Sequence, residues 1–228
     1  MTSPTPSPLR SDPAHRGEGS TGGAGFASDV AFTPAVKAIQ TRKGSRPAYA
    51  RMEAGGSWEQ VITADLKAEI ESQTSVFLAT ANADGQPYIQ HRGGPAGFLH
   101  VLDGQTIAFA DFSGNRQYIT QGNLEENPRA HLFLIDYAKR RRIKVWGTAR
   151  VVEGDAELLR RLMPTGYRAT PEQVVLFTVT AWDVNCPQHI PQRIDAADVA
   201  AAIRVRDEHI AVLEAEVARL KGAPSHAA

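Results

Sequence analysis

Alternation of apolar and polar positions sets the central part of this chain apart from both ends. Between Ser75 and Val184, short runs rich in β-branched and aromatic residues alternate with turns such as the D-G turn at 82–85, a pattern typical of hairpins. The predicted strands cover residues 76–81, 87–92, 98–102, 106–110, 130–137, 142–152 and 174–184. Most connections are too short for the crossovers that parallel strands need. The pattern therefore predicts a mainly β fold, an antiparallel barrel with flanking helices.

Helical spacing precedes and interrupts these strands. The predicted helices run from Pro34 (with Thr33 as N-cap) to about Gly44, and over 63–72, 115–126 and 155–163. A basic cluster accompanies the first helix and is interpreted as a solvated face beside a loop. Its members are Arg42, Lys43, Arg46 and Arg51.

A purely helical pattern begins after Asp195 and continues to Leu220. Seven positions are spaced by alternating steps of four and three: Val199, Ile203, Arg206, Ile210, Leu213, Val217 and Leu220. Such spacing is a heptad seam, interrupted once by Arg206. An amphipathic helix packed on its own barrel gives much the same pattern, so both arrangements stay open. We favour self-association through this helix.

Composition divides the chain into four parts. Residues 1–30 are rich in Ser, Pro and Gly and are expected to be a disordered tail, with an arm that orders against a partner subunit as the alternative. Residues 31–194 form the predicted barrel domain with its leading helices. The C-terminal helix spans 195–221, and 222–228 is a second disordered tail.

Charge and cysteine content restrict the function classes. The 228 residues contain 25 Lys+Arg and 25 Asp+Glu, so the net charge gives no reason to expect nucleic acid. No apolar run has the length of a membrane span, and the N-terminus lacks the apolar segment of a signal peptide. The single cysteine fits a reducing compartment. We expect a cytoplasmic protein without membrane contact.

The first candidate site is the segment 91–95, H-R-G-G-P. Arg92 at a strand end suits a phosphate, because a guanidinium makes two charge-assisted hydrogen bonds to it. Gly93 and Gly94 permit a close approach of the backbone to a ligand. An ordinary turn has the same composition, so this motif alone does not distinguish a phosphate site from a turn.

The second candidate is the segment 112–116, F-S-G-N-R, between a strand and a helix. Backbone N–H groups at a helix start and the Ser113 hydroxyl suit an anion, and Arg116 adds a positive charge. The alternative is that Ser113 or Asn115 is a simple N-cap.

Two further segments carry candidate chemistry. Arg142 and Lys144 share one face of a strand by alternation, and a basic strand face needs acidic partners or a bound phosphate. Cys186 and His189 are three residues apart, which permits a Cys-His dyad, although a buried thiol before a turn is the simpler interpretation. No second Cys/His pair completes a zinc site, so no metal is expected.

Taken together, these segments resemble the pyridoxamine 5′-phosphate oxidase-like FMN-binding split barrels. The motifs that carry the resemblance are R-G-G-P-x-G-F at 92–98, D-F-x-G-N-R at 111–116, G-N-L-x-x-N-P-R at 122–129 and N-C-P-x-H at 185–189. The resemblance implies a homodimer with FMN at the subunit interface. It also implies that Arg92, Ser113 and Arg116 bind the phosphate, and that Arg142 and Lys144 contact the cofactor from the neighbouring subunit.

The family resemblance implies an FMN-dependent oxidoreductase that acts on a small molecule by hydride transfer at flavin N5, with NAD(P)H as a candidate donor. His189 is a candidate proton donor, and Cys186 is a candidate pocket residue. One motif departs from pyridoxamine phosphate oxidases: D-V-N-C-P-Q-H-I-P-Q-R follows Trp182 where they carry an R-L-H-D-R-like motif. A different substrate is therefore expected. The alternatives are a non-catalytic flavin-binding or sensing module and a haem- or deazaflavin-binding barrel.

Overall fold

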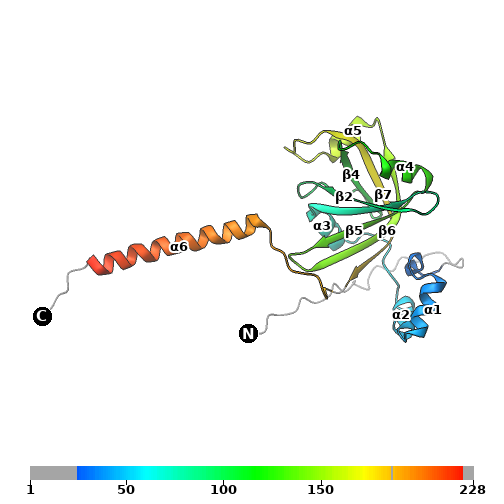
Figure 1. Ribbon diagram of the computed structural model, residues 1–228, viewed down its shortest axis with the longest axis horizontal. Helices are drawn as coiled ribbons and strands as arrows, with labels where there is room; N and C mark the ends of the chain where they lie inside the picture. Colours follow the sequence, from blue (N-terminus) through cyan, green and yellow to red (C-terminus); the bar gives the residue numbers. More distant parts are fainter. Residues whose placement is uncertain (1–24, 186, 223–228) are drawn as a thin grey trace.

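The structure, a computed structural model, describes residues 25–185 and 187–222 (Figure 1). Its helices are η1 (Ala27–Val30), α1 (Pro34–Arg42), α2 (Arg46–Ala54), α3 (Ala64–Ser72), α4 (Ile119–Glu126), α5 (Ala156–Leu162) and α6 (Ala196–Gly222). Its strands are β1 (Ser75–Ala81), β2 (Pro87–Gly93), β3 (His100–Val101), β4 (Thr106–Phe112), β5 (Arg129–Asp136), β6 (Arg141–Val152) and β7 (Pro171–Asn185).

All seven strands belong to one antiparallel sheet in the order β2-β1-β5-β6-β7-β4-β3. The predicted antiparallel barrel with flanking helices is confirmed. The sheet curls so that α3 lies on one side and α4 and α5 lie at one end (Figure 1). Its ladder begins at β2 and ends at β3, so the barrel stays open between these two edges.

Strict alternation on the strands builds the core. On β1 every second residue is buried, and Val76 and Leu78 are fully enclosed together with Leu132 of β5 and Val145 of β6. These side chains point inward because successive residues of a strand face opposite sides. Leu66 and Ile70 of α3 complete the same cluster from outside the sheet.

Two bulges interrupt β7 and change which side chains point inward. Pairing with β6 shifts between Trp146 and Gly147, and pairing with β4 shifts between Asp111 and Phe112. At the second shift Glu172 is the extra residue, since Asp111 pairs with Gln173 and Phe112 pairs with Pro171. A bulge re-aims neighbouring side chains, and this one lies beside the candidate site.

The helices before the barrel form a small unit around a buried carboxylate. Glu53 of α2 is almost fully buried; Arg46 forms an ion pair with it, and Lys37 Nζ lies 3.6 Å from its Oε1. The expectation that Arg46 belongs to a solvated face is therefore wrong, because a buried carboxylate needs a paired cation. The N-cap at Thr33 is confirmed: its hydroxyl accepts a hydrogen bond from Val36 N.

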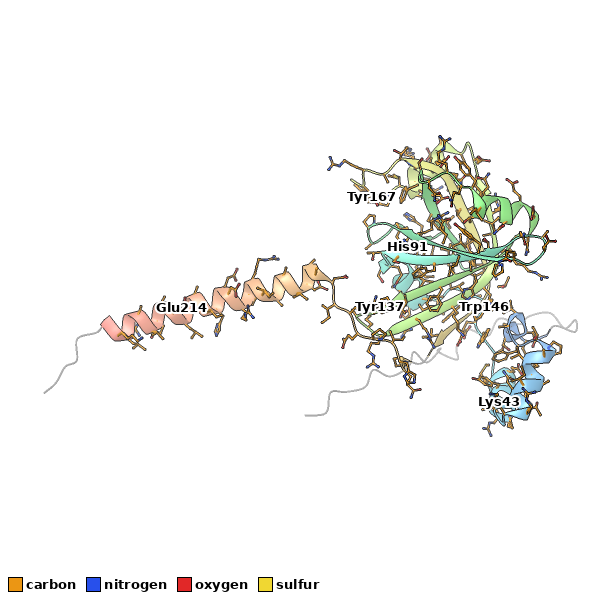
Figure 2. All side chains as sticks on the ribbon, viewed as in Figure 1. Lys43, His91, Tyr137, Trp146, Tyr167 and Glu214 are labelled. Atoms are coloured by element: carbon orange, nitrogen blue, oxygen red, sulfur yellow. The ribbon has the colours of Figure 1, made fainter. Side chains whose placement is uncertain are left out.

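Trp58 connects this helical unit to the barrel. Its ring stacks on Trp146 of β6 with centroids 4.6 Å apart. Figure 2 shows Trp146 on the side of the barrel nearest to α1 and α2. The packed aromatic pair thus anchors the N-terminal helices on the outer face of the sheet.

Several predicted boundaries differ from the structure: β4 ends at Phe112 rather than at 110, and β7 begins at Pro171 rather than at 174. α4 begins at Ile119 rather than at Asn115, because Arg116 (φ 59°) and Tyr118 (φ 55°) adopt left-handed backbone conformations that a helix cannot contain. The predicted strand at 98–102 is shorter, and only His100 and Val101 pair with β4.

The C-terminal helix α6 extends away from the barrel (Figure 1). Residues 196–221 are all exposed, so the helix does not pack on its own barrel. Among the helices of the described residues, none is both long enough and apolar enough to cross a membrane.

Candidate functional site

A polar pocket lies between β2, β4, the start of β7 and the loop that precedes α4. Its volume is about 230 Å³. The lining residues are Tyr88, Gln90, Arg92, Asp111, Phe112, Gly114, Asn115, Arg116, Gln117, Tyr118, Ile119, Thr120, Gln121, Val151, Glu172 and Gln173. Tyr88, Gln90 and Arg92 line it together because they alternate along β2 and share one face.

Arg92 is the most enclosed cation of this pocket. Its Nε lies 2.8 Å from Asp111 Oδ1, and both side chains are mostly buried. The close approach is electrostatic, since this buried Nε has no hydrogen-bond partner among the described residues. Its two other contacts, to Asp111 Oδ2 and to His91 O, are both 3.5 Å long. Ordinary N–H···O bonds measure roughly 2.7–3.2 Å, so the guanidinium retains capacity for a further acceptor.

Asp111 is held by a second polar group. Gln173 Nε2 donates to Asp111 Oδ2 at 3.1 Å. The bulge at Glu172 brings both Glu172 and Gln173 to the pocket, although consecutive strand residues normally point to opposite faces. Thr120 of α4 donates its hydroxyl hydrogen to Gln90 Oε1 at 3.1 Å, which fixes the opposite wall.

Arg116 reaches the pocket from the loop before α4. Its Nε donates to the Tyr118 hydroxyl at 3.0 Å, and this hydroxyl donates to Glu172 Oε1 at 2.5 Å. The hydrogen bond to Tyr118, together with the charges of Tyr118 and Glu172, raises the pKa of the Arg116 guanidinium above its ordinary value. The left-handed backbone at Arg116 and Tyr118 gives this exposed loop its shape.

The residues present fit an anionic group such as a phosphate. Arg92 and Arg116 converge on one pocket, and Asp111 and Glu172 balance their charges. A phosphate placed here would accept hydrogen bonds from the two guanidinium groups, whose present hydrogen bonds are long or are made to exposed partners. The lining residues include no His, Cys or Met, the side chains that most often bind haem iron, although Tyr88 and Tyr118 carry hydroxyls.

Three predicted cofactor residues do not line this pocket. A Cβ on Gly93 would meet the His91 ring at 2.9 Å, and a Cβ on Gly94 would meet Phe98 at 2.7 Å. Both glycines are therefore needed for packing of the chain after β2. Ser113 is exposed, and its backbone N–H donates to Thr170 O at 2.8 Å.

Arg142 and Lys144 also lie away from the pocket. They point to the outer face of β6, whereas Ile143 and Val145 point into the core. Lys144 Nζ lies 3.0 Å from Asp183 Oδ2 and 5.1 Å from the Trp146 ring centre. Its predicted need for a partner is thus met inside the chain by a carboxylate and by aromatic faces.

The two candidate catalytic residues fall elsewhere. Cys186 lies outside the described residues. His189 is exposed in the turn after β7, with φ 63°. Arg140 holds this turn through bonds to Pro187 O and Ile190 O, on the side of the β5–β6 hairpin and not at the pocket.

Several pocket residues were not predicted from the sequence. Tyr88 and Gln90 were identifiable by their alternation with Arg92 on a predicted strand. Glu172 and Gln173 were not, because only the bulge in β7 places both of them at the pocket.

With this geometry established, comparison with known families gives one match. Residues 62–186, more than half of the chain, match the model described as pyridoxamine 5′-phosphate oxidase. The chain belongs to this family. The matched region contains the whole polar pocket. A search of curated proteins gives no match.

Solved structures with the same barrel include three with low sequence identity. HupZ from Group A Streptococcus is 19% identical, over 58% of this chain and 99% of its own, with a TM-score of 0.44. An FMN-binding protein from Syntrophomonas wolfei is 15% identical, over 64% and 97%, with a TM-score of 0.41. An FAD-binding protein from Mycobacterium smegmatis is 16% identical, over 56% and 97%, with a TM-score of 0.36.

Proposed function

We propose that the protein is an FMN-dependent oxidoreductase that acts on a small molecule and binds the FMN phosphate in the polar pocket. The observation that carries this proposal is the incompletely bonded guanidinium of Arg92. Its buried Nε lacks a hydrogen-bond partner among the described residues, and its terminal contacts are long. Asp111 covers the Nε, so the terminal nitrogens with their long contacts are the donors left for a ligand, and a phosphate supplies three acceptor oxygens.

The other lining residues have distinct roles in this proposal. Arg116 supplies the second positive charge from an exposed loop, and it exchanges its bond to Tyr118 for one to the phosphate. Gln90 and Gln173 supply neutral amides that hydrogen-bond without adding charge. FMN, when bound, supplies hydride transfer at N5, while the chain binds it, orients it and limits the access of water.

We also propose that a second copy of the chain completes the site. The pocket of about 230 Å³ is smaller than the roughly 300–1,000 Å³ of most ligand sites. Its outer wall is the exposed loop at 113–118, which faces solvent in the single chain. A partner subunit placed on this side encloses the cofactor, and Arg142 and Lys144 remain candidates for contacts from that partner.

The substrate of this proposal is not pyridoxamine 5′-phosphate. The segment after Trp182 lacks the R-L-H-D-R-like motif that pyridoxamine phosphate oxidases use for substrate and flavin. His189, which follows in that segment, lies in the turn that Arg140 holds and is not at the pocket.

A non-catalytic flavin-binding module is the second candidate, and α6 favours it. The helix extends from the barrel with its apolar side chains exposed, as expected of an element that transmits a signal to a partner. The difference between the two candidates is turnover, not cofactor binding.

The absorption spectrum of the purified protein tests the cofactor. Flavin bands support FMN binding, a Soret band indicates haem, and a deazaflavin spectrum indicates that cofactor instead. Stopped-flow reduction by NADH and by NADPH then separates the two candidates. Rapid reduction with multiple turnovers supports the oxidoreductase, and a bound flavin that is not reduced supports the binding module.

A further inference from the structure

The apolar seam of α6 is an exposed apolar surface that the pocket does not explain. Its members are Val199, Ile203, Ile210, Leu213, Val217 and Leu220, each more than 40% exposed. Helices in proteins derive most of their stability from packing, and all of residues 196–221 are exposed in the single chain. A helix of 27 residues in this state needs a partner.

The positions along this seam specify what that partner is. Assigning Ile203, Ile210 and Val217 to heptad position a places Leu213 and Leu220 at position d. β-Branched residues at a with Leu at d favour two-stranded parallel coiled coils. We propose that α6 pairs with α6 of a second copy of this chain as a parallel, in-register coiled coil.

Charges beside the seam agree with the parallel orientation. In a parallel pair, a residue at position g faces position e of the next heptad on the partner. Glu216 then faces the partner's Lys221, a pair of opposite charges. Glu216 also bonds Arg219 of its own helix, so it links the two helices without losing its local partner.

The antiparallel orientation is less favourable. With the seams aligned in opposite directions, Asp207 faces the partner's Glu214, and like charges repel at both symmetry-related contacts. An antiparallel pair also places the two barrels at opposite ends of helices about 40 Å long. A parallel pair keeps both barrels at one end, so a single twofold axis can relate the two barrels and the two helices.

Arg206 is the one charged residue in the seam, at position d. In the parallel pair it lies beside the partner's Asp207, a residue that it already bonds within its own helix at 3.2 Å. A single polar seam position fixes the register of a coiled coil and lowers its stability. This predicts that Arg206→Leu strengthens the pairing of the helices.

Disulfide formation in the full-length chain tests the pairing. In a Cys186→Ser background, Leu220→Cys places two thiols side by side only if the helices are parallel and in register. The matched control is Val212→Cys, which lies outside the seam and is 65% exposed. We expect Leu220→Cys to form a disulfide-linked dimer at least about tenfold faster than Val212→Cys, because pairing raises the local thiol concentration.

A second variant separates helix pairing from dimers held only by the barrels. Adding Leu213→Asp to the Leu220→Cys chain should abolish the rapid reaction, whereas adding Val212→Asp should leave it unchanged. Equal rates for Leu220→Cys and Val212→Cys would overturn the proposal. An unchanged rate after Leu213→Asp would also overturn it, as would rapid crosslinking only between Ile203→Cys and Leu220→Cys.

Discussion

Arg92 and Asp111 form an ion pair across the pocket, with Arg92 Nε 2.8 Å from Asp111 Oδ1. The pair joins edge strand β2 to β4, two strands that are not neighbours in the sheet. It therefore holds the open side of the barrel where the proposed phosphate binds. The terminal nitrogens of Arg92 make only 3.5 Å contacts, which is why we propose that they also bind the phosphate.

Neutralising the acid of this pair should change stability and affinity in opposite directions. Asp111→Asn leaves the mostly buried Arg92 without its carboxylate, so we expect the cofactor-free protein to lose about 1–3 kcal/mol of unfolding free energy. The same change removes a negative charge beside the phosphate and should tighten FMN binding several-fold. Thermal unfolding with and without FMN measures both effects.

The matched control for Asp111→Asn is Glu157→Gln on α5, which removes an acid from an exposed pair with Arg160. This control should change neither the unfolding free energy nor the FMN affinity measurably. If Asp111→Asn bound FMN more weakly than the unmodified protein, the idea that Asp111 competes with the phosphate would be wrong.

His131 should make stability depend on pH below neutrality. Burial, and then the charge of Lys144, lower its pKa from 6.5 to about 4. The unfolded chain therefore binds this proton at a higher pH than the folded chain does. The stabilisation is fully present above about pH 6.5 and is lost as the pH falls towards 4. It amounts to about 2 kcal/mol after allowance for partial exposure.

Urea unfolding between pH 7 and pH 4 measures this loss. His131→Phe keeps an aromatic ring beside Trp146 but cannot titrate, so its stability should fall less steeply with pH. The control is His209→Gln on exposed α6, which should follow the unmodified protein. Identical slopes for His131→Phe and the unmodified chain would show that another group titrates.

Gly147 of β6, which lies opposite the first bulge of β7, tolerates no side chain. A Cβ there would lie 2.0 Å from the backbone oxygen of Thr178 in β7 and 2.6 Å from the ring of Phe177, which is fully buried. We expect Gly147→Ala to lower the unfolding free energy by about 3 kcal/mol or more. Gly122→Ala on α4 meets no atom within 4 Å and should stabilise by about 0.5–1 kcal/mol. Chemical denaturation of the two variants measures whether the unfolding free energy falls for Gly147→Ala and rises for Gly122→Ala.

Local patterns were sufficient to predict the strands and to place Arg92 near the end of one of them. Alternation with a period of two and the end of a strand both depend only on neighbouring residues. The pairing of Lys144 with Asp183 was not predictable in the same way. It depends on the register of β6 against β7, which is set only when residues 39 apart in the chain come together on folding. Gly93 and Gly94 illustrate the same limit, because the atoms that require them lie in Thr74, His91 and Phe98.

The bulge at Glu172 explains why the sequence did not predict Glu172 and Gln173 as pocket residues. The predicted strand begins at residue 174 and does not include Glu172 and Gln173, whereas in the structure β7 begins at Pro171 and both residues line the pocket. A bulge is a two-strand property, so a single strand's pattern does not contain it. The helical pattern predicts a helix from residue 115, and residues 115–118 are not helical because Arg116 and Tyr118 adopt a left-handed conformation that such residue types usually avoid.

Titration with FMN and with riboflavin tests the central claim most directly, because the two ligands differ only in the phosphate. The unmodified protein should bind FMN at least about tenfold more tightly than riboflavin. Arg92→Ala should weaken FMN binding about 10- to 100-fold and leave riboflavin binding nearly unchanged. Arg160→Ala, which removes the same charge from the exposed surface of α5, should affect neither ligand. Equal affinity for FMN and riboflavin, or full retention of FMN by Arg92→Ala, would contradict a phosphate site at Arg92.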